Sequence, residues 1–307
     1  MAESDYTAGA AQPNQSIRHA INKLWDYGQP DLTEQRFLAL VPAVEASGDP
    51  DYFGQLLTQL ARSQGLQRKF DQARSTLDRV EKMLAERESD HRLDVVRVRY
   101  ALESGRVLNS SDQPDKALPF FEQAAKLAEA AGEIGYQIDA IHMVAIAVPE
   151  VNEKIKWNLK ALTLIQNHPL QSGWLSAVYN NLGEAYISSG KYELALDIFR
   201  KIIDMETARG RAPEWFMHKD VARCFRLTGK PLEALAIMQP LADDEDKTGQ
   251  HNGWISEELA EDLAALGRFN EARTRFQQAY DVFAADPWEV EHEPQHLAHL
   301  KQSALRP

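Results

Sequence analysis

The amino-acid sequence predicts an all-α protein, a solenoid of about six or seven stacked helical hairpins. The first observation is the stretch 179–200, where two short amphipathic patterns flank the turn Ser-Gly-Lys. The second is that this unit recurs along the chain at a nearly constant spacing. Small residues let the two helices of a hairpin approach closely, and large apolar residues fill the space beside them. In the stretch 179–200 these positions are Leu182, Gly183, Tyr186, Ala195 and Phe199.

Each recurrence is marked by a small residue in the second helix, followed four residues later by a large apolar one. Ala117 and Ala195 are 78 residues apart, which is twice 39, so a further hairpin is predicted between them with Ile155 and Leu159 in these positions. The remaining steps are 44, 39 and 38 residues. The other pairs are Thr33 and Phe37 in a weaker first unit within 21–40, Ala73 and Leu77, Ala117 and Phe121, Ala195 and Phe199, Ala234 and Met238, and Ala272 and Phe276.

The motif L-G-x-x-Y, followed by Ala195 and Phe199, resembles the signature of the tetratricopeptide repeat. The period near 39 exceeds the usual length of about 34. Polar linkers between the units account for the difference. They resemble the long-repeat variety found in kinesin light chains and in bacterial regulators that sense peptides. The resemblance covers about residues 16–286. It implies a right-handed superhelix whose first helices line a concave surface.

The two ends of the chain depart from the repeat pattern. Residues 1–15 are small and polar, so we expect a mobile segment, and they lack the pattern of a signal peptide. Residues 287–307 follow a Pro-containing break and are predicted to form a C-terminal cap. In that cap Leu297, Leu300 and Ala304 have the spacing of one helix face and would pack on the last hairpin.

Composition excludes several classes of function. A net charge of −12 argues against a general nucleic-acid binder. No run approaches the roughly 18 apolar residues that a membrane span needs. Cys224 is the only cysteine, so an intrachain disulfide and a four-cysteine zinc site are excluded, which is compatible with a cytoplasmic location. Because Cys224 lies beside Ala222 and Phe225 in a helix pattern, we expect a buried thiol rather than a nucleophile.

The string H-E-P-Q-H at 292–296 formally matches the H-E-x-x-H pattern of zinc proteases. That pattern needs one continuous helix, whereas Pro294 suits the start of a new helix and leaves His292 outside it. His296 and His299 would then belong to a solvated tail. No catalytic grouping or phosphate loop is present in the sequence, so we predict no enzyme, no cofactor and no metal. A metal-dependent enzyme that uses this tail is the least favoured alternative.

Candidate binding residues lie on the first helices, on the face turned away from hairpin packing. The basic ones suggest a ligand that is acidic or bears a carboxylate, with the acids of the protein placed elsewhere. Trp174, Trp215 and Trp254 recur where first helices begin, either as packing between repeats or as an aromatic shelf. The predicted site is Asn180, Asn181, Glu184, Lys219, Arg223, Arg226 and Trp254, with Arg62, Arg99 and Arg106 farther back and Glu257 and Glu261 in the last unit.

These features predict a non-catalytic scaffold or adaptor that binds a peptide or partner protein in a concave groove. A peptide-sensing regulatory domain is the alternative. One variant of the repeat clamps the C-terminal carboxylate of chaperones with Lys, Arg and Asn. Asn181 matches its central Asn, but Ala140, Ala145, Phe216 and Asp220 depart from it, so that partner is not expected.

Overall fold

The computed structural model describes residues 21–305, and in that range every regular element is a helix. The predicted all-α class is therefore confirmed, while the segment 1–15 lies outside the described residues. Within the described range, none of the helices combines the length and the apolar character that crossing a membrane requires. The chain divides into two compact units, Met1–Val178 and Tyr179–Pro307.

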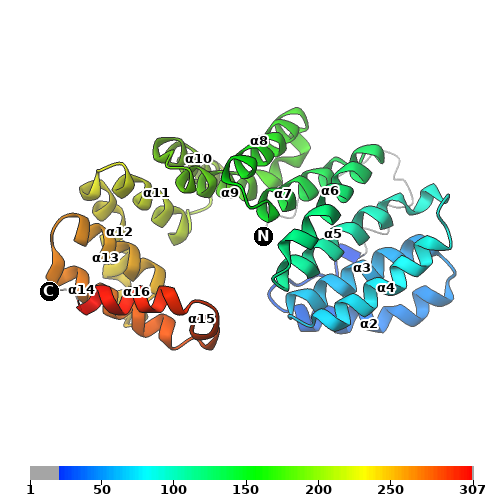
Figure 1. The fold of residues 1–307 in the computed structure, drawn as a ribbon, viewed down its shortest axis with the longest axis horizontal. Coiled ribbons are helices and arrows are strands. Elements are labelled where there is room, and N and C mark those ends of the chain that lie inside the picture. The colour runs from blue at the N-terminus through cyan, green and yellow to red at the C-terminus, as the bar shows by residue number, and fades with distance from the viewer. Residues whose placement is uncertain (1–20, 306–307) are drawn as a thin grey trace. The chain divides into compact units, whose positions relative to one another are not determined.

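The first unit is a succession of helices paired into hairpins (Figure 1). Ile21 is fully buried and belongs to a core cluster that it shares with residues of α2, α3, α4, η1 and α5. The elements are α2 (Pro30–Ala46), α3 (Pro50–Leu66), α4 (Phe70–Ala85), the short η1 (His91–Leu93), α5 (Asp94–Ser110), α6 (Pro114–Ala130), α7 (Ile134–Ala147), α8 (Val151–Asn167) and η2 (Pro169–Trp174).

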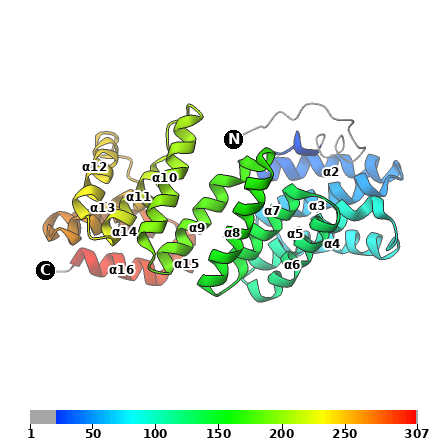
Figure 2. The ribbon, with the colours of Figure 1, turned by 90° about the horizontal axis from the view of Figure 1, so that it is seen from above.

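The second unit continues the alternation, beginning within α9. Its last helix, α16, lies along α14 in both views (Figures 1 and 2). The elements are α9 (Leu175–Ser188), α10 (Tyr192–Ala208), α11 (Trp215–Leu227), α12 (Pro231–Thr248), α13 (Gly253–Ala265), α14 (Phe269–Ala284), α15 (Pro287–His292) and α16 (Pro294–Leu305).

In most of the hairpins, the turn between the two helices contains a residue in the left-handed backbone conformation, whereas the turn between α7 and α8 contains none. In the hairpin of α9 and α10, Gly190 has φ 74° and the Lys191 N–H donates to the Tyr186 carbonyl at 2.9 Å. Gly229 and Gly267 occupy the same place in the next two hairpins. A residue without Cβ adopts this conformation at no steric cost, which is why the sequence repeats Gly at these turns. Arg68 has the same left-handed conformation, with φ 59°, although its side chain has a Cβ.

The predicted alternation of small and large residues is confirmed in the core. The alanines at the marker positions are 0–2% exposed, and Phe121 and Phe199 are 0% and 1% exposed. Gly183 is small because the Phe199 ring covers it, so that a Cβ built on Gly183 would lie 2.5 Å from Cζ of Phe199. A Cβ built on Gly105 would lie equally close to its neighbour, 2.5 Å from Cε1 of Phe121. The close approach is therefore between a glycine of the first helix and a phenylalanine of the second.

This contact predicts opposite outcomes for two glycines of the first unit. Gly105→Ala is expected to lower the free energy of unfolding by roughly 1–3 kcal/mol, because overpacking against Phe121 outweighs a helix-propensity gain of about 1 kcal/mol. A Cβ added at Gly65 would have only Val107 Cγ2 near it, at 3.8 Å, so Gly65→Ala is expected to keep the stability gained from helix propensity. Urea unfolding of the two variants measures the difference. Equal stability of both variants would contradict the contact.

The hairpin predicted from spacing alone is present as α7 and α8, but only the first of its two marker positions is buried. Leu159 is 42% exposed, so it does not fill the interior as expected. Ile155 is buried as expected, at 8% exposure, and the buried face of α8 continues through Asn158, Ala161 and Ile165, at 1%, 0% and 2% exposure.

Candidate functional site in the second unit

The second unit contains an open groove of about 650 Å³. Its walls come mainly from the first helices α11 and α13, and α15 and the start of α16 close one side. Pro287 at the first helical position and the Asp286 side chain, which accepts from the Trp288 N–H, start the short helix α15. The lining residues are Ile187, Tyr192, Lys219, Arg223, Arg226, Leu227, Trp254, Glu257, Glu258, Glu261, Trp288, Glu289, Glu293 and His296.

Four of the seven predicted site residues line this groove, namely Lys219, Arg223, Arg226 and Trp254. Glu184 contacts it indirectly, because its carboxylate pairs with Arg223 at 3.2 Å. Asn180 is exposed and Asn181 is partly buried, and neither is among the lining residues.

Arg226 is the most heavily engaged cation of the groove. Its Nε and Nη2 donate to the two carboxylate oxygens of Glu258 at 2.9 and 3.1 Å, a bidentate geometry from α11 to α13. Asp262 lies 3.4 Å from Nε and Glu261 lies 3.8 Å from Nη1. One guanidinium therefore lies within ion-pairing distance of three carboxyl groups, and its hydrogen bonds to Glu258 join α11 to α13.

The other two cations are also paired. Arg223 bridges to Glu184, with both side chains about a third to two-fifths exposed, a pair expected to contribute about 0.2–1 kcal/mol. Lys219 Nζ lies 3.2 Å from the buried Asp220 carboxylate and 5.6 Å from the centre of the Trp254 ring. The expectation that the acids lie elsewhere is therefore wrong, since they share this face with the bases.

In the first unit, arginine side chains likewise connect neighbouring first helices. Arg62 of α3 reaches Glu103 of α5 at 3.4 Å. Arg106 pairs with Glu103 at 2.7 Å and also reaches Asp139 of α7. Arg99, which is 3% exposed, donates to the Gln55 amide oxygen at 3.0 Å. The predicted basic residues farther back thus join neighbouring first helices, Arg62 and Arg106 through carboxylates and Arg99 through the neutral Gln55 amide.

Of the histidines near the C-terminus, His292 and His299 are exposed, as expected for a solvated tail, whereas His296 is partly buried. His292 ends α15 and His296 lies in α16, so H-E-P-Q-H is not one helix. The His296 ring stacks on Trp254 with 5.5 Å between ring centres, and its Nε2 lies 3.0 Å from a Glu257 oxygen. His299 lies 3.4 Å from Glu261. In residues 21–305 no group of three or more His, Cys, Asp or Glu side chains has a metal-binding arrangement.

The tryptophans divide between the two roles that the sequence left open. Trp174 and Trp215 are partly buried and pack on hydrophobic cores, as expected for contacts between repeats. Trp254 is 43% exposed in the groove, although its ring also makes an edge contact with Phe283 at 4.8 Å. Trp288, also 43% exposed, lines the same groove. The sequence reasoning missed Trp288, because it lies outside the repeat period.

Cys224 takes no part in this surface. The side chain is fully buried in the core beside Ala195 and Phe199. Burial raises the pKa of its thiol to about 12, so the thiolate that a nucleophile requires is not formed near neutral pH. The expectation of a buried thiol is confirmed.

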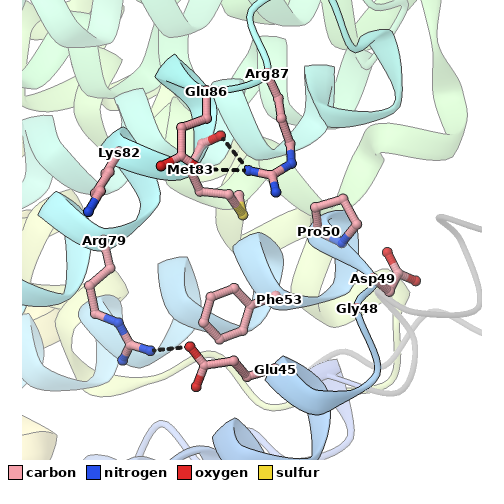
Figure 3. A pocket seen from close by; sticks show the side chains of 10 residues that line it. All are labelled: Glu45, Gly48, Asp49, Pro50, Phe53, Arg79, Lys82, Met83, Glu86 and Arg87. Atoms are coloured by element: carbon pink, nitrogen blue, oxygen red, sulfur yellow. Dashed lines mark hydrogen bonds and ion pairs between the residues drawn. The ribbon is translucent and has the colours of Figure 1, made fainter.

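A second hollow, of about 420 Å³, lies in the first unit between the ends of α2 and α4 and the start of α3 (Figure 3). Its basic side chains are paired locally, Arg79 with Glu45 at 3.3 Å and Arg87 with Glu86 at 3.2 Å. The Arg79 guanidinium also lies over the Phe53 ring at 5.4 Å. None of the predicted site residues lines this hollow.

Stacked helical hairpins define this chain as a helical-repeat protein. Residues 176–208 match the tetratricopeptide repeat family, which confirms the resemblance on the hairpin where the sequence pattern is strongest. No curated protein sequence matches the chain significantly.

Solved structures share the fold at low sequence identity. A tetratricopeptide repeat protein from Parabacteroides merdae is 14% identical, with a TM-score of 0.57 over 95% of this chain and 99% of that one. A signal transduction ATPase with a tetratricopeptide repeat sensor from Pyrococcus horikoshii is 13% identical, with a TM-score of 0.67 over 92% of this chain and 43% of that one.

The third similar protein is the quorum sensor NprR. Its apo form, from B. thuringiensis, is 13% identical, with a TM-score of 0.63 over 94% of this chain and 81% of NprR. NprR in complex with its cognate peptide NprX gives 14% identity and a TM-score of 0.58 over 94% of this chain and 83% of NprR. At these identities the likeness establishes the tetratricopeptide-like fold.

Proposed function

We propose that this protein is a non-catalytic scaffold or adaptor that binds a peptide or an extended segment of a partner protein in the groove of the second unit. The observation that carries the proposal is the pairing of two half-exposed tryptophans, Trp254 and Trp288, with convergent charged groups in one open groove. Aromatic side chains that combine large area with few rotatable bonds are typical anchors of recognition surfaces.

The groove also suits a peptide by its construction. It is formed by regular helices whose side chains are fixed by ion pairs such as Arg226 with Glu258, so the surface is organised before a ligand arrives. Its lining combines apolar groups, such as Tyr192 and Leu227, with carboxylates. We propose a cytoplasmic location for this role.

A peptide-sensing regulatory domain is the second candidate. It is favoured by the similarity of fold to NprR, which has been solved with its cognate peptide, and to a repeat region named as a sensor. The two candidates share the groove and differ in the consequence of binding. A sensor changes the spacing of its hairpins when a ligand binds, whereas an adaptor keeps it. Small-angle scattering with and without a bound peptide distinguishes them.

The proposal predicts a specific loss of binding in Trp288→Ala. Peptides selected from a random display library on the purified chain are expected to bind this variant roughly thirtyfold more weakly, the effect of losing an interface anchor worth about 2 kcal/mol. Fluorescence anisotropy of the labelled peptides measures the affinity. Trp288 lies in a short helix and stacks only on His292 among the described aromatic rings, so the fold is expected to persist.

The matched control is Phe269→Ala, which removes another exposed aromatic side chain of the same unit outside the groove. It is expected to leave peptide affinity unchanged. Selected peptides that bind Trp288→Ala and Phe269→Ala equally well would contradict the placement of the site, and a library that yields no binder would contradict the function.

A further inference from the structure

The charge of the groove opposes the ligand that the sequence suggested. Five glutamates line it against three Lys or Arg side chains. All three cations are already engaged, because Lys219 pairs with Asp220, Arg223 with Glu184 and Arg226 with Glu258. An incoming carboxylate would meet cations whose charge is already balanced by carboxylates of the protein, which weakens the attraction.

Three of the glutamates retain binding capacity. Glu257 has His296 as its contact, with 3.0 Å between the Glu257 oxygen and Nε2. Glu293 is exposed, and no Lys or Arg of residues 21–305 lies within ion-pairing distance of it. Together with Glu289 they come from α13, from α15 and from the short connection to α16.

Glu289 provides an independent sign of a missing partner. The residue is 8% exposed and lines the groove, and its Oε2 is buried without a hydrogen-bond donor in the described part of the chain. The nearest cationic group is His296 Nδ1 at 3.8 Å, which is beyond hydrogen-bond length. Buried carboxylate oxygens in folded proteins normally accept hydrogen bonds, so this atom is available for a donor from a ligand.

The aromatic rings favour the same class of ligand. The face of an indole ring is electronegative and attracts ammonium or guanidinium groups. Trp254 already holds the Lys219 ammonium at 5.6 Å in this way. Trp288, which stacks on His292 with 5.0 Å between ring centres, is 43% exposed at the edge where Glu289 and Glu293 lie. Alkyl stems of Lys and Arg pack well on such surfaces while their charged ends reach carboxylates.

We propose that the groove selects a basic peptide segment, with a Lys or Arg side chain bound by Glu257, Glu289 and Glu293 against the exposed face of Trp288. This inference rests on the proposed peptide-binding function and gives it a ligand chemistry. Direct charge complementarity supports it, because the carboxylates that remain after internal pairing outnumber the cations that remain.

Three sets of fluorescein-labelled peptides of about eight residues test the proposal, each random except for a central pair fixed as Lys-Arg, Asp-Glu or Ser-Ser. The basic set is expected to bind at least about tenfold more tightly than the other two at low salt, and to weaken as salt is raised. Glu293→Gln is expected to weaken binding of the basic set by several-fold, and Glu289→Gln by about tenfold, because Glu289 is desolvated.

Arg223→Gln tests the opposite sign, since it removes a positive charge from the same groove. It is expected to tighten binding of the basic set, because it removes repulsion between like charges. If Glu289→Gln unfolds the protein, the variants Glu293→Gln and Arg223→Gln still show whether the groove prefers a basic or an acidic peptide. Tighter binding of the acidic set, lost in Trp288→Ala, would overturn the basic selectivity and leave the peptide-binding function standing. Failure of all three sets to bind would overturn both.

Discussion

Phe199→Ala is expected to lower the free energy of unfolding by about 3–5 kcal/mol, the largest effect of a single truncation in the second unit. The ring is 1% exposed and packs with Ile202, Val221 and Cys224 in one core. Its removal leaves a cavity that α9 and α10 cannot close, because their crossing is already set by Gly183 under the ring. Urea unfolding followed by circular dichroism measures the loss.

A double-mutant cycle makes this prediction specific. Gly183→Ala alone is expected to destabilise, since its Cβ would meet Phe199 at 2.5 Å, but in the Phe199→Ala background the added methyl group occupies vacated space. The penalty should therefore vanish or change sign. Phe269→Ala, at a position 56% exposed, should change stability by less than about 0.5 kcal/mol. Additive effects of the two core substitutions would show that Gly183 and Phe199 are not in contact.

Asp262→Asn is expected to stabilise the protein progressively as pH rises. Asp262 is 0% exposed, and neither carboxylate oxygen has a hydrogen-bond partner among the described residues. Burial, together with the adjacent Glu258 charge, raises the pKa of Asp262 from 3.8 to about 8, against the opposing effect of Arg226. The folded protein thus keeps this group protonated near neutral pH.

The sign follows from proton linkage. Between about pH 4 and pH 8 the unfolded chain has lost the Asp262 proton while the folded chain retains it, so stability falls as pH rises. The full contribution is present below the unfolded pKa and is lost as pH rises through the folded value. Asn carries no proton to lose, so the stability difference between variant and wild type should grow by up to about 1.4 kcal/mol per pH unit in this window.

Thermal unfolding at a series of pH values measures this difference, with Asp204→Asn as the control. Asp204 is exposed on α10, so its replacement should give a difference that is small across the same range. A pH-independent difference for Asp262→Asn would mean that this carboxylate is ionised in the folded protein and that Arg226 balances it. The measurement therefore determines whether Asp262 is charged in the cluster that joins α11 to α13.

Much of the fold was predictable because it depends on local geometry. Residues four apart share a helix face, so Ala195 and Phe199 could be placed in the core from their spacing alone. The turn glycines follow from the conformation that ends a helix. Where the local signal was poor, spacing still predicted the hairpin of α7 and α8, but an average period does not fix a rotation about the helix axis, and Leu159 was placed inward incorrectly.

The site was predictable only as a set of candidates. Lys219, Arg223, Arg226 and Trp254 were found because first helices of this repeat line one surface. The ion pairs of these cations were not visible in the sequence, since the partner of Arg226 is 32 residues away on another helix. Trp288 and Glu289 belong to a short helix outside the repeat, and only its packing beside α14 and α16 brings them to the groove.

The sequence by itself determined the helices, their turns and the small-to-large register of the hairpins, because these depend on interactions within a few residues of the chain. The tertiary structure decided which charges of the groove are neutralised and which remain for a ligand. Ion pairs form between side chains that only the packing of successive hairpins brings within a few ångströms. For this reason the groove that the sequence suggested for a carboxylate is, in the folded protein, a surface whose remaining charge is negative.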